Sequence, residues 1–216
     1  LIVIDTGSGP AALAETNGAV GQFITNLTAS GIDPKSVDAV VISHFHPDHV
    51  NGLVDANGRP VFPQAEVLVP SVEWKYWMDD GEMSRAPKGR MEALFKNNRR
   101  VFDAIGRKVT QYDWNKEIVS GLLPIPTLGH SIGHTSFVMS SGKDKIFVQS
   151  DVTNNPDLFA RRADWGGNFD QDPAMAVATR RRVYDMLVAE KMLVQGFHYP
   201  FPGLGWVEKA EGGYKV

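Results

Sequence analysis

The chain has 216 residues, of which 43% are hydrophobic, so it is long enough to bury a sizeable core as a single domain over residues 1–216. Its formal net charge of −3 argues against an obligate nucleic-acid partner, and no stretch reaches the roughly 20 apolar residues that a membrane-spanning helix needs. The absence of cysteine excludes a thiol nucleophile and fits either a reducing or an oxidising compartment.

Strands and helices alternate along the chain, without a repeat, a low-complexity tract or a linker. Apolar runs predict strands over residues 1–5, 37–43, 66–69, 118–125, 135–140 and 145–150. Helical spacing predicts a helix near residues 17–30, two helical segments separated by Asp79-Asp80-Gly81, and a helix over residues 172–191. We expect the three arginines at 180–182 to form the solvated face of that last helix. The alternation predicts an α/β (α+β) fold.

The hexapeptide His44-Phe45-His46-Pro47-Asp48-His49 carries three of the six histidines and a carboxylate. It follows an apolar run, residues 39–42, so we expect it at the C-terminal mouth of a buried strand, where α/β folds place ligands. Imidazole nitrogen and carboxylate oxygen bind zinc at about 2.0–2.2 Å. His44 and His46 point the same way if the chain stays extended. The alternative is a polar loop that carries histidines by chance, but the clustering favours a metal site.

The other histidines, and one aspartate, also follow apolar runs or lie beside glycine or proline. His130 and His134 belong to the segment Gly129-His130-Ser131-Ile132-Gly133-His134, which lies between two predicted strands. Asp151 comes just after the apolar run at residues 146–148, and His198 follows the run at 192–194. We therefore expect these side chains at one edge of a sheet, where a shared ion would explain their repetition at strand ends.

The order HxHxDH, GHxxGH, strand-end aspartate and final histidine resembles the metallo-β-lactamase superfamily. The resemblance runs from Asp5-Thr6-Gly7 to the C-terminus and implies an αββα sandwich, two mixed sheets between helices. The chain opens inside a predicted strand at Leu1, so we expect the first strands of that fold to be missing. Any signal peptide would belong to the missing part, and a periplasmic, secreted or cytoplasmic location therefore stays open.

The resemblance also implies two divalent metal ions, with zinc as the expected metal. His44, His46 and His130 would hold one ion, Asp48, His49 and His198 would hold the other, and Asp151 would bridge both. Two ions about 3.5–4 Å apart can share a hydroxide that attacks a carbonyl carbon or a phosphorus atom. The catalytic candidates are therefore Asp151 and Asp48, which is also a candidate proton donor to the leaving group.

Two further residues are candidate partners of the metal ligands. His134 would either orient His130 or serve as a structural loop histidine, and both alternatives stay open. Asp5 begins the turn sequence Asp-Thr-Gly, which favours a structural role, although the family places this aspartate where it could orient a ligand.

The substrate is the least constrained prediction. Within the superfamily, Arg85-Ala86-Pro87 and Phe201-Pro202-Gly203 resemble methyl parathion hydrolase, and Trp77 and Phe95 match positions that line the aromatic substrate pocket of that enzyme. This would suit an apolar ester or an aryl leaving group. The loop at residues 8–13 differs from the family pattern, so we expect lactone or ester hydrolysis, with organophosphate cleavage weaker.

Other functions share parts of this pattern. An N-acyl homoserine lactonase would have every one of these ligands, and a persulfide dioxygenase would use the same fold with one iron. A true β-lactamase, a nucleic-acid-processing relative and a non-catalytic metal-binding module fit less well. We expect a small-molecule substrate and no nucleic-acid or membrane partner, and a homodimer stays open.

Overall fold

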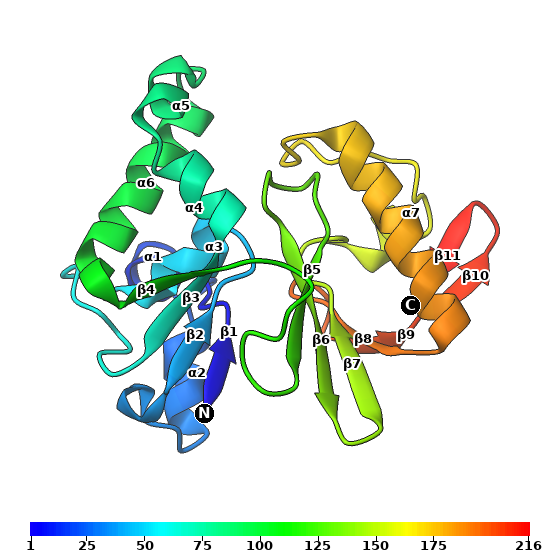
Figure 1. Cartoon of the computed structure of the whole chain (residues 1–216), viewed down its shortest axis with the longest axis horizontal. Coiled ribbons are helices and arrows are strands. Elements are labelled where there is room, and N and C mark those ends of the chain that lie inside the picture. The colour runs from blue at the N-terminus through cyan, green and yellow to red at the C-terminus, as the bar shows by residue number, and fades with distance from the viewer. The chain divides into compact units, whose positions relative to one another are not determined.

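The computed structural model describes the backbone of residues 1–216 and every side chain except that of residue 107. The chain divides into two compact units, Leu1–Tyr112 and Asp113–Val216, which are described separately here as the first and the second unit (Figure 1). Both units contain helices and strands, which confirms the predicted mixed α/β class. The assignment of residues 1–216 to a single domain stays a prediction.

The first unit contains a four-stranded parallel sheet in the order β1-β2-β3-β4. Its elements are β1 (Ile2–Ile4), α1 (Gly9–Glu15), α2 (Phe23–Ala29), η1 (Pro34–Ser36), β2 (Ala39–Val41), α3 (Pro47–Val50), η2 (Asn51–Leu53), β3 (Glu66–Pro70), α4 (Ser71–Trp77), α5 (Asp80–Arg85), α6 (Arg90–Ile105), η3 (Gly106–Lys108) and β4 (Val109–Tyr112). β2 is buried at every position, as expected for an apolar strand inside a parallel sheet. The strand registers align Val3 with Val40 and Val40 with Val67, so the three valines form one apolar row.

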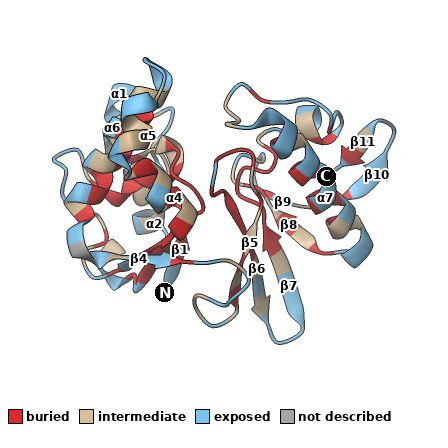
Figure 2. Ribbon diagram, turned by 45° about the horizontal axis from the view of Figure 1, so that its top comes forward, coloured by how far each residue is buried: buried red, intermediate tan, exposed pale blue. Residues whose placement is uncertain are grey.

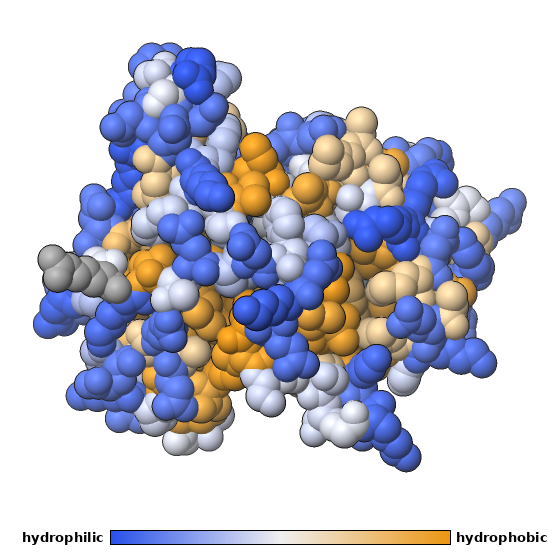
Figure 3. Space-filling view, in the orientation of Figure 1, coloured by the Kyte–Doolittle hydropathy of each residue, from blue (hydrophilic) through white to orange (hydrophobic). Residues whose placement is uncertain are grey.

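The core of the first unit is completed by α6, whose buried residues recur with the helical period from Leu94 to Ile105. Figure 2 shows the buried residues in red on the helices and strands of this unit. The helix ends at Gly106, because a φ of 65° suits glycine. The prediction of a break at Asp79-Asp80-Gly81 was wrong in part, since the Asp79 carboxylate accepts the Glu82 N–H at 2.7 Å and begins α5. The side chains over α5 are mostly hydrophilic (Figure 3).

The second unit contains a five-stranded mixed sheet in the order β5-β6-β7-β8-β9 and a separate hairpin, β10–β11. Its elements are β5 (Leu122–Pro126), β6 (Thr135–Ser141), β7 (Asp144–Val148), η4 (Pro156–Ala160), α7 (Pro173–Glu190), β8 (Leu193–Gln195), β9 (Leu204–Trp206), β10 (Glu208–Ala210) and β11 (Gly213–Lys215). β7 and β8 run parallel, and the other neighbours in this sheet run antiparallel. β6 and β7 form a hairpin, in which Ser141 pairs with Asp144.

The helix α7 begins as predicted, with the Asp172 carboxylate accepting the Met175 N–H at 2.9 Å. The prediction that the three arginines face solvent was wrong for Arg180, which is only 2% exposed. Its Nε donates to the Val152 carbonyl at 3.0 Å and its Nη1 donates to the Trp165 carbonyl at 2.6 Å. Arg180 thereby binds the backbone of the segment between β7 and α7 at two residues. Among the described residues, no helix combines the length and the apolar character needed to cross a bilayer.

Candidate metal centre

The loop that follows β2 brings His44 and His46 together. His46 has an extended backbone (φ −73°, ψ 150°) and Pro47 then begins α3, so the chain is extended at the second histidine. As a result Nε2 of His44 lies 3.0 Å from Nδ1 of His46, and both rings are buried. Two nitrogens that bind one tetrahedral zinc at about 2.0–2.1 Å are separated by roughly 3.3 Å. The two imidazoles therefore have the spacing of a chelating pair.

The next two candidate ligands lie on the single turn of α3. His49 is fully buried, whereas the Asp48 side chain is 37% exposed, and Nε2 of His49 is 3.7 Å from Oδ2 of Asp48. Consecutive side chains on a helix do not normally face each other, but these two approach each other. All four predicted ligands of the first unit lie within eight residues of the end of β2, on the loop and the helix that follow it.

A buried aspartate at the end of β1 contacts this loop. Oδ1 of Asp5 accepts the Ser43 N–H at 2.8 Å, and Oδ2 lies 2.7 Å from the Ser43 hydroxyl, which donates to it. Oδ2 is also 2.8 Å from Nδ1 of His49. The Ser43 Oγ is 3.0 Å from Nδ1 of His44. Asp5, for which a structural role was favoured, therefore contacts a predicted ligand directly, and Ser43 was missed by the sequence reasoning.

These contacts assign the tautomers of two imidazoles. The Ser43 hydroxyl has one proton and donates it to Asp5, so the N–H between Ser43 and His44 belongs to Nδ1 of His44. A carboxylate only accepts, so His49 also carries its proton on Nδ1. In the neutral form of each ring, Nε2 is then the nitrogen with the lone pair. This is the state of a metal-binding histidine whose second nitrogen is held by a neighbouring acceptor.

The second unit contains a corresponding cluster around Asp151. Oδ2 of Asp151 lies 3.3 Å from Nε2 of His130 and 3.1 Å from Nε2 of His198. On the other side of the His130 ring, Nδ1 is 2.9 Å from Oδ1 of Asp170, which the sequence reasoning did not single out. The second oxygen of Asp170 accepts the Gly167 N–H at 2.9 Å, which fixes the carboxylate in the loop. The structure thus places a carboxylate between two predicted ligands of this unit.

The pKa of His130 reflects the two carboxylates beside its ring. Burial lowers the pKa of the imidazole, but Asp151 and Asp170 outweigh burial and raise the pKa above its ordinary value. Two buried carboxylates therefore make the surroundings of His130 favourable for positive charge. Such surroundings suit a divalent cation as well as a proton.

His134, for which an orienting and a structural role both stayed open, contacts backbone groups of the second unit. Its Nδ1 is 2.9 Å from the Thr127 carbonyl oxygen, and its Nε2 accepts the backbone N–H of Asp151 at 3.0 Å. The ring lies edge-on to His130 with the centroids 5.5 Å apart. His134 therefore fixes the backbone of Asp151, and its two ring nitrogens are engaged within the second unit.

The predicted substrate contacts lie in the core of the first unit. Trp77 and Phe95 have no exposed surface, and their ring centroids are 4.7 Å apart. The indole N–H of Trp77 donates to Oε2 of Glu73 at 2.7 Å. A role for the two rings in substrate binding stays a prediction.

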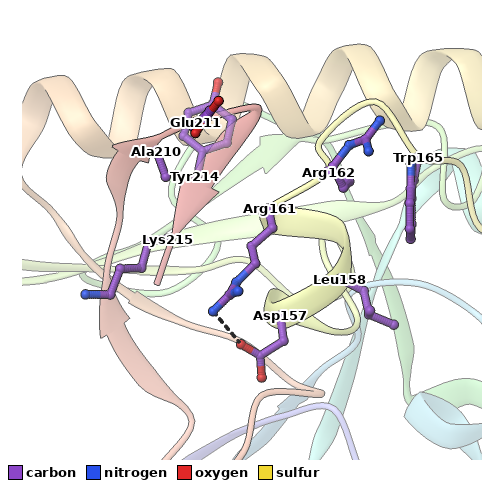
Figure 4. Close-up of a pocket in the computed structure, with 9 residues that line it drawn as sticks. All are labelled: Asp157, Leu158, Arg161, Arg162, Trp165, Ala210, Glu211, Tyr214 and Lys215. Atoms are coloured by element: carbon purple, nitrogen blue, oxygen red, sulfur yellow. Dashed lines mark ion pairs between the residues drawn. The ribbon is translucent and has the colours of Figure 1, made fainter.

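The second unit contains a hollow of about 450 Å³. It is lined by η4, the segment that follows it and the β10–β11 hairpin, and Figure 4 labels its nine lining residues. Trp165 and Leu158 supply apolar surface, and Arg161 lies 3.9 Å from Asp157. None of the predicted metal ligands lines this hollow.

Comparison with known proteins adds independent findings. A family model described as the metallo-beta-lactamase superfamily matches residues 1–183. No curated protein sequence matches the chain. The crystal structure of hydrolase AbOPH, in the beta lactamase superfamily, is 28% identical with a TM-score of 0.88, covering 99% of this chain and 74% of that one.

Two further structures are similar. AidC, a dizinc quorum-quenching lactonase in complex with the product N-hexnoyl-L-homoserine, is 27% identical with a TM-score of 0.88, covering 100% of this chain and 74% of that one. A probable metal-dependent hydrolase from Staphylococcus aureus is 24% identical with a TM-score of 0.74 over 92% of this chain and 70% of that one, which supports the fold alone.

Proposed function

This chain belongs to the metallo-beta-lactamase superfamily and is a metal-dependent hydrolase, and on that basis we propose that it hydrolyses lactones with an apolar substituent by means of two zinc ions. The observation that carries the proposal is the orientation of the imidazoles. Nδ1 of His44, His49 and His130 each faces an oxygen of the same unit, contributed by Ser43, Asp5 and Asp170 respectively. Their Nε2 atoms are therefore directed away from these acceptors, which is the orientation that metal ligation through Nε2 requires.

The donor set fits zinc. It consists of imidazole nitrogens and carboxylate oxygens without sulfur, a combination that zinc binds readily. His44, His46 and His130 would hold one ion, Asp48, His49 and His198 would hold the other, and Asp151 would contribute its carboxylate to both. When bound, the ions would supply a water that ionises near neutral pH and would polarise the ester carbonyl.

The protein's own residues have separate tasks in this proposal. Asp151 keeps its position because His134 holds its backbone N–H. Asp48 is the candidate that moves a proton to the leaving oxygen, because its side chain is 37% exposed whereas that of Asp151 is 3% exposed. A carboxylate that reaches solvent can be reprotonated between turnovers.

The similarity to one of the solved structures supports a lactone as the substrate. AidC is a quorum-quenching lactonase that was solved with an N-acyl homoserine product, and the similarity covers 100% of this chain and 74% of AidC. A phosphotriester stays an alternative, because the same attack is chemically available at phosphorus.

Metal analysis is the first test. Elemental analysis of the protein purified without a chelator is expected to give about two zinc ions per chain. One iron ion per chain would contradict the hydrolase with two zinc ions and support the dioxygenase alternative. Asp151→Ala should lose metal and activity together, whereas Asp144→Ala, in the β6–β7 hairpin, serves as a control and should keep both.

A substrate panel is the second test. N-hexanoyl homoserine lactone, an aromatic lactone, a nitrophenyl ester and paraoxon should be compared by kcat/KM with the zinc-loaded protein. We expect the lactones to have the highest values. A higher value for paraoxon than for every lactone and ester would refute the proposed substrate class while leaving the metal centre intact.

Asp48 has its own experiment. Asp48→Asn removes the ionisable proton, and it should slow aryl esters with poor leaving groups more than those with nitrophenolate, which departs without protonation. Equal losses across the leaving-group series would show that Asp48 is only a ligand.

A further inference from the structure

We propose that Glu73 is a positioning residue for the metal-binding loop, because its buried carboxylate fixes the backbone between His44 and His46 and so sets the separation of their ring nitrogens. The inference rests on the proposed function in one respect, namely that these two histidines bind a metal ion. It concerns a residue of α4 that the sequence pattern did not single out.

The contacts of Glu73 are specific. The side chain has no exposed surface, and its Oε2 accepts two hydrogen bonds, from the Phe45 N–H at 3.0 Å and from the Trp77 indole N–H at 2.7 Å. Glu73 and Trp77 are four positions apart on α4, so they share one face of the helix. Burying a carboxylate is costly unless it is hydrogen-bonded. A carboxylate at this core position therefore indicates that its acceptor oxygens are needed.

The position of the Phe45 amide explains why this bond matters. The last sheet contact of the β2 strand is the Ile42 N–H to the Leu68 carbonyl at 2.8 Å, and the next amide, Ser43 N–H, is held by Asp5. Two residues later the partner of the backbone is Glu73. Side chains therefore replace the neighbouring strand as the hydrogen-bond partners of this segment.

The ring of Phe45 is fixed as well as its amide. Its ring is buried and packs against Phe102 of α6 with the centroids 4.4 Å apart. With both its amide and its ring fixed, Phe45 cannot rotate without breaking one contact. In an extended chain the flanking side chains point to the opposite side. His44 and His46 are thereby directed together, with 3.0 Å between their nitrogens.

Trp77 then has a defined task. Its indole N–H orients the Glu73 carboxylate, and Phe95 packs against its ring. This task does not require contact with substrate, and it accounts for a tryptophan without exposed surface.

A purely structural role for Glu73 makes a different prediction. If the carboxylate only fastened α4 to the core, its loss would lower the free energy of unfolding but leave the metal affinity of the folded protein unchanged. If it positions the loop, the metal affinity and the ligand geometry must change in the folded protein as well. Measurements of metal binding therefore separate the two roles.

The experiment compares full-length variants after metal removal, by titration with zinc against a chelator and by the visible absorption of the Co²⁺-loaded protein. Glu73→Leu should weaken metal binding by about tenfold or more, as loss of an outer hydrogen bond does in metal sites, and should change the Co²⁺ spectrum. Glu73→Gln should stay within about threefold of the parent protein, because one amide oxygen can accept both N–H groups. Trp77→Phe, which removes the indole N–H together with part of the ring volume, should fall between these two variants.

Ile105→Ala is the matched control, because Ile105 lies in the same core at the far end of α6. It should lower the melting temperature without changing the metal affinity or the spectrum. An unchanged affinity and spectrum in folded Glu73→Leu would overturn the proposal. If Glu73→Leu does not fold, Trp77→Phe decides, since an unchanged spectrum and affinity there would overturn it too. Absence of metal binding by the parent protein would instead refute the proposed function.

Discussion

Asp5 and His49 are 44 positions apart in the chain, yet Oδ2 of Asp5 lies 2.8 Å from Nδ1 of His49 in the interior of the first unit. The parallel pairing of β1 with β2 brings them together, because Ile4 is the partner of Val41 and the two strands end at the same edge. The carboxylate fixes both the orientation of the imidazole and the nitrogen that carries its proton.

Asp5→Ala should therefore impair metal binding. Without the carboxylate the His49 ring loses its acceptor and Ser43 loses two contacts. We expect the zinc affinity to fall by about 10- to 100-fold and the free energy of unfolding to fall by about 3 kcal/mol. Zinc titration and urea unfolding of the metal-free protein measure the two effects. A variant that is destabilised but binds zinc as tightly as the parent would leave Asp5 with the structural role alone.

Asp170→Ala tests the same principle in the second unit. This carboxylate holds Nδ1 of His130, so its removal should lower the zinc affinity by about tenfold or more. Asp172→Ala is the matched control, since Asp172 caps α7 and its loss should cost about 1 kcal/mol of stability without affecting zinc. Equal zinc affinities in the two variants would contradict the role of Asp170.

Arg180→Ala should destabilise the segment between β7 and α7. Its guanidinium donates to the carbonyls of Val152 and Trp165, which would lose their donors. Two hydrogen bonds from a buried charged group together contribute about 3 kcal/mol. Urea unfolding checks this value, and Arg181→Ala, at an exposed neighbour, should change the free energy of unfolding by less than about 0.5 kcal/mol. Similar losses in the two variants would argue against the buried contacts of Arg180.

Tyr184 should make stability depend on alkaline pH. Burial raises the pKa of Tyr184 to about 12, whereas an unfolded tyrosine titrates near pH 10. Between about pH 10 and about pH 12 the native state keeps a proton that the unfolded state has released. The contribution is complete below pH 10 and is lost as the pH rises through the native pKa, at about 1.4 kcal/mol per pH unit.

Urea unfolding at about pH 9.5 and about pH 11.5 tests this expectation. The loss of free energy between the two values should be smaller in Tyr184→Phe than in the parent protein. The neighbouring Tyr199 has a raised pKa for the same reason, burial, and it remains in the variant. Identical losses in the two proteins would show that Tyr184 titrates normally.

The local part of the site could be predicted from the sequence. The apolar run before His44 predicted a buried strand, and the two-residue spacing of His44 and His46 predicted that their rings lie on one side. Both predictions are confirmed, by the complete burial of β2 and by the 3.0 Å between the ring nitrogens. These features depend on neighbours in the chain, which periodicity describes.

The partners of the ligands could not be predicted, because they come from distant segments. Asp170 is 40 positions from His130, and Glu73 is 28 positions from Phe45. No spacing rule connects such pairs before the fold is known. The burial of Arg180 is different, because helical spacing in the sequence indicated it. Arg180 lies four residues after the buried Ala176 and four before the buried Tyr184, so helical spacing places it on the inner face of α7.

The pairing of β1 with β2 has a consequence for the mutations that this protein tolerates. In a strand, a shift of one residue turns every side chain to the opposite face. An insertion or a deletion between residues 1 and 5 would therefore move the Asp5 carboxylate away from Ser43 and His49 even if every ligand were retained. Exchanges of one apolar residue for another at Ile2, which is 42% exposed, should be accepted. We expect natural variation in β1 to change side chains freely while keeping the length of the strand constant.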